Sequence, residues 1–476
     1  MSGKLPPGPF PLPIIGNIHQ LGQNPNQSMA KLAKIYGPIM SLRLGSRFTV
    51  VVSSPSMAKE VLQKNDQVLA SRTIANAVEA HGHYSVSVAW MSPTNQWRTL
   101  RKISKERMFT IQSLDAGEFL RQKKIQELYD YVRGCSARGE TVNIGEAAFT
   151  TTLNLITTTL FSVDFAAYNS NTSQELKEIV SGVTELAGTP NFADYFPFLR
   201  FFDPQGILKE SRYYFGRLLD TFDGYISERE AHRISLGNNY VRKNDMLEAL
   251  LDHRDKNPSE LSRKDIKHLL LDLLVAGSDT TSVTVIWAMA QLLRNPEKRA
   301  KARAELEQVI GRQKDQVLLK ESDISRLPYL QAIIKETFRL HPADPLLVPH
   351  RAEEDVEING YIVPKDTNIL VNVWATGRDS EAWSDRPNEF IPERFLGSGI
   401  DARGQHFQLI PFGSGRRMCP GQPLAHRMVH LMVATLIRNF EWKLEEGMKP
   451  EDIDMNEKFG LAVQKAVPLK AVPIQI

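Results

Sequence analysis

The chain has only two cysteines in 476 residues, Cys135 and Cys419. Two widely spaced cysteines cannot form a disulfide framework, which excludes a small secreted scaffold held together by disulfides. The chain also lacks an uninterrupted apolar run of about 18 residues, so we expect no bilayer-spanning helix within it. No Gly-x-Gly-x-x-Gly sequence follows a strand-like run, which argues against a dinucleotide- or flavin-binding domain.

An excess of charge of one sign is also missing. The 58 Lys and Arg residues are nearly balanced by 55 Asp and Glu residues, and the net charge of +3 is too small to favour nucleic-acid binding. A hydrophobic content of 42% with 24% charged residues is typical of a soluble globular protein. Because repeats, low-complexity tracts and long polar linkers are absent as well, we expect one large, mostly helical domain.

Local patterns predict the elements outside the long helices. Residues 26–36 have the period of a short amphipathic helix, and residues 39–53 read as two strands joined by a turn at Gly45. Ser54 followed by proline predicts a helix start. Two further short strands are expected at residues 356–362 and 368–373.

The most informative segment is residues 412–421, which read F-G-S-G-R-R-M-C-P-G and hold Cys419 among glycines and arginines. Its glycines would let the backbone pass close to a large flat ligand; they are Gly413, Gly415 and Gly421. Arg416 and Arg417 would favour a thiolate, as would the dipole of the amphipathic helix expected after the segment. The glycines, the arginines and the helix dipole around Cys419 suit a sulfur atom that binds a metal, although a lone cysteine is more often an ordinary buried residue.

The spacing F-x-x-G-x-R-x-C-x-G resembles the haem-binding loop of the cytochrome P450 superfamily. The resemblance implies a mainly α fold with small β-sheets, a long central helix over the haem, and O2 as a co-substrate. It makes Cys419 the axial ligand of the iron in haem b (iron protoporphyrin IX). The haem contacts that it implies in this segment and just after it are Phe412, Gly413, Arg417, Cys419, Gly421 and Ala425.

A second motif lies in the middle of a long apolar helix that is predicted to begin after Ser262, a capping residue with Asp265 three positions on. Residues 276–281 read A-G-S-D-T-T, and Gly277 would permit an opened hydrogen-bond step there. The segment resembles the oxygen-activation motif of the same family. That resemblance makes Asp279 and Thr280 the catalytic pair that controls protons; the alternative is a packing patch with Asp279 paired to an arginine.

Further motifs resemble the structural and haem-binding elements of the family. E-x-x-R and P-E-R-F sequences imply a structural ion network of Glu336, Arg339 and Arg394 behind the haem. A W-x-x-x-R helix implies that Trp97 and Arg101 bind a haem propionate. The other expected propionate partners are Arg417 and His350, with Arg351 as a substitute if His350 is turned away.

The expected substrate pocket is apolar, as for a small hydrophobic ligand. We expect the loop at residues 73–91 and the aromatic cluster at residues 192–202 to line it. The individual pocket residues that we expect are Ala276, Asp344, Leu346, Leu347 and Leu461. Asp344 either points to solvent or binds a substrate hydroxyl. Phrases such as N-F-A-D-Y-F-P resemble plant microsomal terpenoid hydroxylases that act on monoterpenols or abietane diterpenes.

The resemblance also implies partners and a location. We expect residues 1–25 to be a proline-rich lead-in from which a membrane anchor has been removed, and residues 26–476 to be the haem-binding monooxygenase domain; a naturally soluble enzyme is the alternative. The full-length protein would lie on the cytoplasmic face of the endoplasmic reticulum membrane as a monomer. Electrons would come from an NADPH-cytochrome P450 reductase, with no nucleic acid involved. A basic docking surface, or merely a solvated face, is expected at Arg98, Lys102, Lys105 and Arg107.

Other functions remain open on the same fold. One is a hydroperoxide-rearranging enzyme that needs no reductase, although the intact Asp279–Thr280 pair argues against it. Another is oxidation of a non-terpenoid hydrophobic plant metabolite, and a third is a non-enzymatic haem or lipid carrier.

Overall fold

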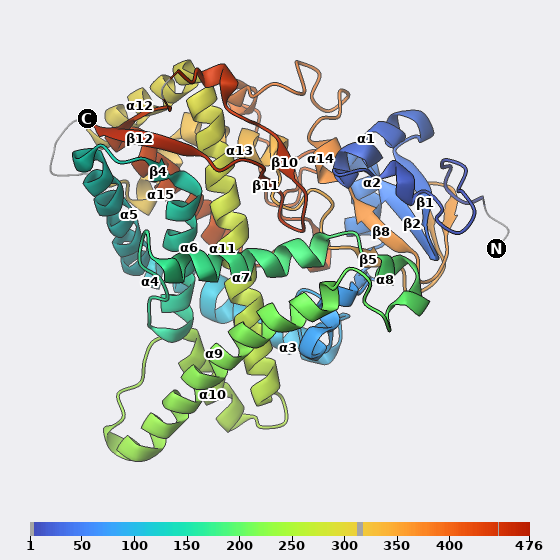
Figure 1. The fold of residues 1–476 in the computed structure, drawn as a ribbon, viewed down its shortest axis with the longest axis horizontal. Coiled ribbons are helices and arrows are strands. Elements are labelled where there is room, and N and C mark those ends of the chain that lie inside the picture. The colour runs from blue at the N-terminus through green and yellow to red at the C-terminus, as the bar shows by residue number, and fades with distance from the viewer. Residues whose placement is uncertain (1–3, 312–317, 446) are drawn as a thin grey trace.

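The computed structural model describes residues 4–311, 318–445 and 447–476, so the first three residues of the expected lead-in lie outside it. Most of the chain is helical, and small sheets lie around one long central helix (Figure 1). This arrangement confirms the prediction of a mainly α fold with small β-sheets.

The largest sheet brings two distant segments together at its edge. Its strand order is β1-β2-β8-β5-β3. The antiparallel pairing of β3 with β5 sets Arg72 opposite His350. The turn between the first two strands contains Gly45, whose φ of +59° is in the left-handed region. The bounds of the strands are β1 (Ile39–Leu44), β2 (Arg47–Val52), β3 (Ser71–Arg72), β5 (His350–Arg351) and β8 (Asn368–Val371).

The single strand predicted at residues 356–362 is wrong. The segment is a hairpin of β6 (Val356–Ile358) and β7 (Tyr361–Val363). Its two turn residues, Asn359 and Gly360, have φ of 50° and 80°. An Asn-Gly pair is typical of the type I′ turn, which requires positive φ at both central residues.

Smaller sheets and the remaining helices complete the domain. The other strands are β4 (Val142–Asn143), β9 (Phe440–Lys443), β10 (Glu457–Lys458), β11 (Gln464–Lys465) and β12 (Lys470–Gln475). The helices other than the central one are α1 (Pro25–Tyr36), α2 (Pro55–Lys59), α3 (Asn95–Ser104), α4 (Ile111–Ala116), α5 (Glu118–Arg138), α6 (Ile144–Phe161), α7 (Asn171–Gly188), α8 (Phe192–Tyr195), α9 (Ile207–Leu236), α10 (Met246–Lys256), α12 (Pro296–Ile310), α13 (Pro328–Leu340), α14 (Val373–Thr376) and α15 (Gln422–Asn439). Ser54 caps α2 as predicted, accepting a hydrogen bond from the amide of Met57.

The central helix is α11 (Arg263–Arg294), which runs vertically through the middle of Figure 1. Ser262 and Asp265 form the predicted capping box at its start. Within the described residues it is the one helix long and apolar enough to cross a membrane, and 67% of its most apolar window is buried inside the protein. This burial is typical of a core helix of a globular protein.

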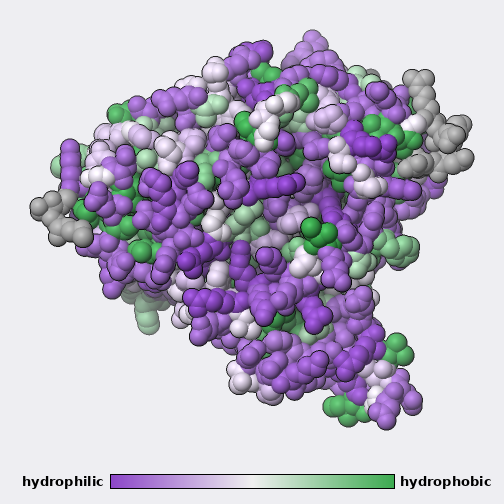
Figure 2. Space-filling view, turned by 180° about the vertical axis from the view of Figure 1, so that it is seen from behind, coloured by the Kyte–Doolittle hydropathy of each residue, from purple (hydrophilic) through white to green (hydrophobic). Residues whose placement is uncertain are grey.

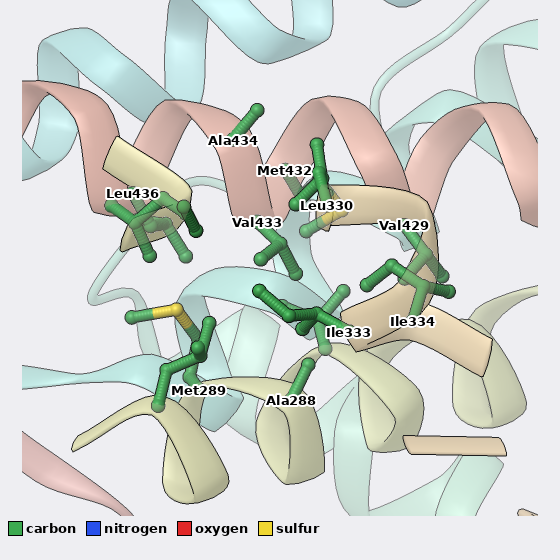
Figure 3. Close-up of a cluster of buried hydrophobic side chains, with 14 of the residues drawn as sticks. Ala288, Met289, Leu330, Ile333, Ile334, Val429, Met432, Val433, Ala434 and Leu436 are labelled. Atoms are coloured by element: carbon green, nitrogen blue, oxygen red, sulfur yellow. The ribbon is translucent and has the colours of Figure 1, made fainter. Parts of the chain in front are cut away.

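Helices α11, α13 and α15 share one hydrophobic core, and Figure 3 shows their side chains converging. Met289 of α11, Ile333 of α13 and Val433 of α15 are each fully buried there. Because interiors are packed to high density, such contacts hold neighbouring helices in a fixed relation. The core therefore holds α15, which follows the Cys419 loop, in a fixed position relative to α11.

Candidate active site

A cavity of about 340 Å³ lies between α11 and the loop that precedes α15. Cys419 and Phe412 line it from the loop, and Ala276 and Thr280 line it from α11. The two motifs that lie 139 residues apart in the sequence, counted from Thr280 to Cys419, thus line one cavity. Other predicted haem contacts that line it are Arg101, His350, Gly413, Arg417, Gly421 and Ala425.

The loop before α15 has a tight and specific conformation. The amide of Cys419 donates to the carbonyl of Phe412 at 2.9 Å, which closes the loop. Gly413 and Gly415 have φ of +69° and +67°, values that side-chain-bearing residues rarely adopt. A Cβ on Gly415 would lie 1.9 Å from the carbonyl oxygen of Leu62, so this glycine serves the packing of the loop and not the approach to a ligand.

Cys419 is a free cysteine with exposed surface, and it lines the cavity. Burial raises its pKa, while the amides of Gly421 and Gln422 and the charge of Arg101 oppose that rise. The prediction that the neighbouring arginines supply this charge is wrong. Arg416 instead points outward to Asp66, 3.3 Å away, and Arg417 donates to backbone carbonyls. A metal at the sulfur would favour the thiolate.

Three guanidinium groups line the cavity, that of Arg72 buried and those of Arg101 and Arg417 partly buried. Among the described residues, Arg72, Arg101 and Arg417 form no ion pair and donate instead to backbone carbonyls. Burial, together with the charge of Arg101, lowers the pKa of Arg417 to about 10. The pKa of Arg72 is also lowered, first by burial and then by Arg417. The carboxyl of Asp344 opposes this lowering at Arg72. Cations without a salt bridge fit an anionic ligand, and the two propionates of a haem are such groups.

Of the predicted propionate partners, Trp97 lies differently from the expectation and His350 does not. Trp97 does not line the cavity, because its indole N–H donates to the carbonyl of Val88 at 3.0 Å. Two guanidinium groups lie over its ring instead. The ring centroid is 4.6 Å from Cζ of Arg417 and 5.3 Å from Cζ of Arg101. His350 does line the cavity, and its Nδ1 lies 2.6 Å from the carbonyl of Leu69. Burial and the charge of Arg72 lower the pKa of His350 well below its usual value.

The proposed catalytic pair is split between the cavity and a polar network behind it. Thr280 lines the cavity, and its hydroxyl donates to the carbonyl of Ala276 at 2.7 Å. Asp279 is buried and accepts from Thr184 at 2.6 Å, from Ser181 at 3.2 Å and from Gln464 at 3.2 Å. Burial raises the pKa of Asp279, and these hydrogen bonds oppose the rise. No arginine pairs with Asp279 among the described residues, which removes that alternative.

Helix α11 continues unbroken through the A-G-S-D-T-T segment. The opened hydrogen-bond step predicted at Gly277 is therefore absent from this structure. A Cβ on Gly277 would lie 2.9 Å from Cδ1 of Ile156, so the glycine allows α6 to pack closely against α11. Thr280 still bonds back to the helix, as hydroxyls at such positions do.

Most of the predicted substrate-pocket residues line the main cavity, namely Ala276, Asp344, Leu347 and Leu461. Leu346 lines only a neighbouring cavity of about 130 Å³, and Asp344 lies at the wall of both. Asp344 thus faces the interior and not bulk solvent. Burial raises its pKa to about 7, and the charge of Arg72 opposes the rise.

The aromatic cluster at residues 192–202 was wrongly assigned to the pocket. Its rings do not line the main cavity, and Phe201 is 91% exposed. Asp194 holds this segment to the rest of the fold, accepting from Arg47 at 3.0 Å and from the amide of Asn76 at 2.9 Å. The segment at residues 73–91 does line the cavity, through Val78, His83, Val88, Ala89 and Trp90. It is not one long loop as predicted, because Asn76–Ser85 forms a 3₁₀ helix.

The structure brings the three residues of the expected ion network together. Arg339 forms a bidentate pair with Glu336 through two contacts of 2.7 Å, and Arg394 reaches the same carboxylate at 3.1 Å. Both Glu336 and Arg339 are fully buried. The neighbouring Phe338 packs edge-on against Phe412 with ring centroids 5.1 Å apart. The network is therefore linked directly to the Cys419 loop.

Sequence reasoning missed several polar residues that line or support the cavity, namely Arg72, His83, Thr184, Asp272 and Gln464. None of them belongs to a motif with fixed spacing. Arg72 reaches the site only through the pairing of β3 with β5. Thr184 and Gln464 reach Asp279 from α7 and β11.

Comparison with known proteins gives a consistent result. The cytochrome P450 family matches residues 6–470. The chain is 61% identical over 473 residues to cytochrome P450 76T24 of Catharanthus roseus, covering 99% of this chain and 94% of that protein. It is 52% identical over 472 residues to ferruginol synthase of Isodon rubescens, covering 99% of this chain and 95% of that protein. It is 51% identical over 471 residues to geraniol 8-hydroxylase of Swertia mussotii, covering 99% of this chain and 94% of that protein.

Proposed function

This chain belongs to the cytochrome P450 family, and from that premise we propose that it hydroxylates a small terpenoid, either a monoterpenol or a diterpene. Membership makes it a haem-thiolate monooxygenase that uses O2. In our proposal the haem is haem b, and electrons come from a separate NADPH-cytochrome P450 reductase. The protein acts as a monomer at the cytoplasmic face of the endoplasmic reticulum.

One observation carries this proposal, namely that the thiol of Cys419 lines an apolar cavity beside three guanidinium groups that form no salt bridge among the described residues. Thiolate ligation of haem favours cleavage of the O–O bond. The residues that would hold the group are Cys419 at the metal and Arg72, Arg101 and Arg417 at the propionates. A hydrocarbon substrate suits the remaining wall, because most of the lining surface is apolar.

The chain's own residues would orient the substrate and deliver protons. Thr280 presents a hydroxyl at the cavity wall, and Asp279 holds a carboxyl whose pKa is raised by burial. Thr184 lines the cavity and donates to Asp279, so it offers a second hydroxyl between the carboxyl and the reaction space. A carboxyl with a raised pKa is suited to proton transfer near neutral pH.

A basic surface near the Cys419 side of the fold supports the reductase as electron donor. Arg98, Lys102, Lys105 and Arg107 are all exposed on or next to α3. The same helix carries Arg101, whose guanidinium donates to the carbonyl of Met418 beside the ligand. Docking between oppositely charged surfaces weakens with added salt, so turnover by the reductase should fall as ionic strength rises.

An exposed apolar surface supports the membrane location. Phe10 and Ile14 of the lead-in are 86% and 82% exposed, as are Phe198 and Phe201 at 72% and 91%. The two segments meet at the β1–β2 turn, where Ser46 donates to the carbonyl of Tyr195 at 2.8 Å and Gly45 donates to that of Ile15 at 3.3 Å. Hydrophobic side chains also gather at the left edge of Figure 2, on the N-terminal side of an otherwise hydrophilic face. Flotation with phospholipid vesicles tests this surface.

The proposed function is tested with purified haem-loaded protein, NADPH-cytochrome P450 reductase and a panel of monoterpenols and diterpenes. We expect at least one terpenoid to change the haem spin state on titration and to yield a hydroxylated product that requires NADPH. Turnover of a fatty-acid hydroperoxide without reductase, with no NADPH-dependent oxidation of any terpenoid, would instead support the hydroperoxide-rearranging alternative.

Replacing Thr280 with alanine should separate NADPH use from product formation. The hydroxyl at the cavity wall is lost while the apolar lining remains, so reduction continues but protons are delivered without control. We expect product per NADPH to fall about tenfold and hydrogen peroxide to rise in proportion. NADPH, product and peroxide are measured in the same reaction.

Ser282→Ala is the matched control for that prediction. Ser282 also donates back to its own helix, at 2.9 Å to the carbonyl of Asp279, but it does not line the cavity. The control should keep the coupling of the unmodified enzyme. Tight coupling in Thr280→Ala would mean that protons arrive by a route without this hydroxyl.

A further inference from the structure

A single helical turn at residues 87–91 connects the substrate side of the cavity with the arginines on the haem side. The amide of Met91 donates to the carbonyl of Ser87 at 2.9 Å, which closes the turn. The hydroxyl of Ser87 also accepts from the amides of Ala89 and Trp90, at 3.1 and 3.3 Å. Val88, Ala89 and Trp90 line the cavity, so this turn is also part of its wall.

The amino end of the turn is held by Asp272, which projects from α11. Its carboxylate accepts from the amide of Val88 at 2.7 Å and from the hydroxyl of Ser87 at 2.8 Å. Nε2 of the buried His83 lies 3.1 Å from the same carboxylate. The carboxylate of Asp272 therefore plays the part of a capping residue for this turn, supplied from another helix.

The carboxyl end of the turn is held by the groups that we assign to the haem propionates. The carbonyl of Val88 accepts from Arg417 at 3.3 Å, in addition to the indole of Trp97 at 3.0 Å. The carbonyl of Ala89 accepts from Arg72 at 3.2 Å, and that of Met91 accepts from Arg417. Free carbonyls at the end of a helical turn attract cations, so these contacts fix where the guanidinium groups lie.

We propose that Asp272 is a positioning residue that fixes the 87–91 turn and, through its carbonyls, orients Arg72 and Arg417 to retain the haem. Peptide units are planar and the turn is closed by its own hydrogen bonds, so its two ends move together. A displaced amide of Val88 would displace the carbonyls of the turn that both arginines contact. The remaining contacts, from Arg72 to the carbonyl of Val348 at 2.5 Å and from Arg417 to that of Ala70 at 2.7 Å, hold each guanidinium group from one other side. This role of Asp272 rests on the proposed function in one respect, namely that the cavity must hold a haem.

Asp272→Asn tests the proposal in the haem-loaded enzyme. An asparagine amide presents one acceptor and one donor group, so either the amide of Val88 or the Ser87–His83 pair faces an N–H group. Buried donors that lose their acceptor weaken the contact, and we expect haem to transfer to excess apomyoglobin about tenfold faster. The transfer is followed by the Soret absorbance and requires no turnover.

Asp265→Asn is the matched control. It makes the same chemical change at a buried position in the first turn of the same helix, where Asp265 belongs to the capping box. Its thermal unfolding temperature should fall while its haem transfer rate stays that of the unmodified enzyme. Equal acceleration in both variants would overturn the proposal, because haem loss would then follow general destabilisation.

Two more variants keep the test decisive. Ser87→Ala removes one of the donors to Asp272 and should accelerate haem transfer by about threefold. Asp272→Glu retains a carboxylate and should transfer haem more slowly than Asp272→Asn. Unchanged rates in both Ser87→Ala and Asp272→Asn would overturn the proposal. Failure of the unmodified chain to bind haem would instead overturn the proposed function.

Discussion

Replacing Cys419 with serine should abolish the red-shifted Soret band that reduced, CO-bound haem shows with a thiolate ligand. The sulfur faces the cavity from the closed loop before α15, and no second cysteine lines this cavity among the described residues. A serine hydroxyl is a far weaker donor to iron, so monooxygenase turnover should fall by at least about a thousandfold. Difference spectra of the reduced protein with and without CO, together with turnover, measure both effects.

Cys135→Ser is the matched control for that change. Cys135 is buried in α5, within the core that also contains α15, and it does not line the cavity. This variant should keep the thiolate spectrum, because it loses only the packing of one buried sulfur atom. A thiolate spectrum that persists in Cys419→Ser and disappears in Cys135→Ser would refute the ligand assignment.

Motifs with fixed spacing were the part of the site that the sequence could predict. Cys419, Thr280 and Arg101 all reach the cavity because each lies on or beside one continuous element with a regular local pattern. The start of α11 could be predicted for the same reason, since Ser262 and Asp265 form its capping box within four residues. Local periodicity and capping depend only on neighbours in the chain.

Contacts made across the chain could not be predicted in this way. Arg72 enters the site through a two-residue strand that pairs with His350, which lies 278 residues further along the chain. The indole of Trp97 was expected at a propionate, but its N–H donates to the carbonyl of Val88. Such choices depend on which donor and acceptor groups the tertiary fold brings together, because every buried donor needs a partner.

Apolar composition was the least reliable guide to the pocket. The rings at residues 192–202 were expected inside because burying an aromatic ring is strongly favourable. Phe201 and Phe202 are instead 91% and 72% exposed. A surface that contacts lipid or another protein satisfies the same driving force without burial within the chain.

Replacing Glu336 with glutamine should prevent the chain from accumulating as a haem-loaded protein. The carboxylate of Glu336 holds Arg339 through two contacts of 2.7 Å, and it also accepts from the amide of Ile391 at 2.7 Å. A neutral amide leaves the guanidinium of Arg339 charged in a fully buried site. Breaking a buried pair in this way costs about 3–5 kcal/mol, a large fraction of the stability of a domain. Haem content per protein and urea unfolding measure the loss.

The position of this network explains why haem content should fall together with stability. Arg339 also donates to the carbonyls of Gly377 and Pro387, both at 2.5 Å, so it fixes the backbone of two neighbouring segments. Phe338 beside it packs against Phe412, which accepts the closing hydrogen bond of the Cys419 loop. Glu389→Gln is the control, because among the described residues its side chain pairs only with Arg386, and an exposed pair of this kind contributes little to stability. Equal stability and haem content in both variants would mean that this ion network does not support the loop.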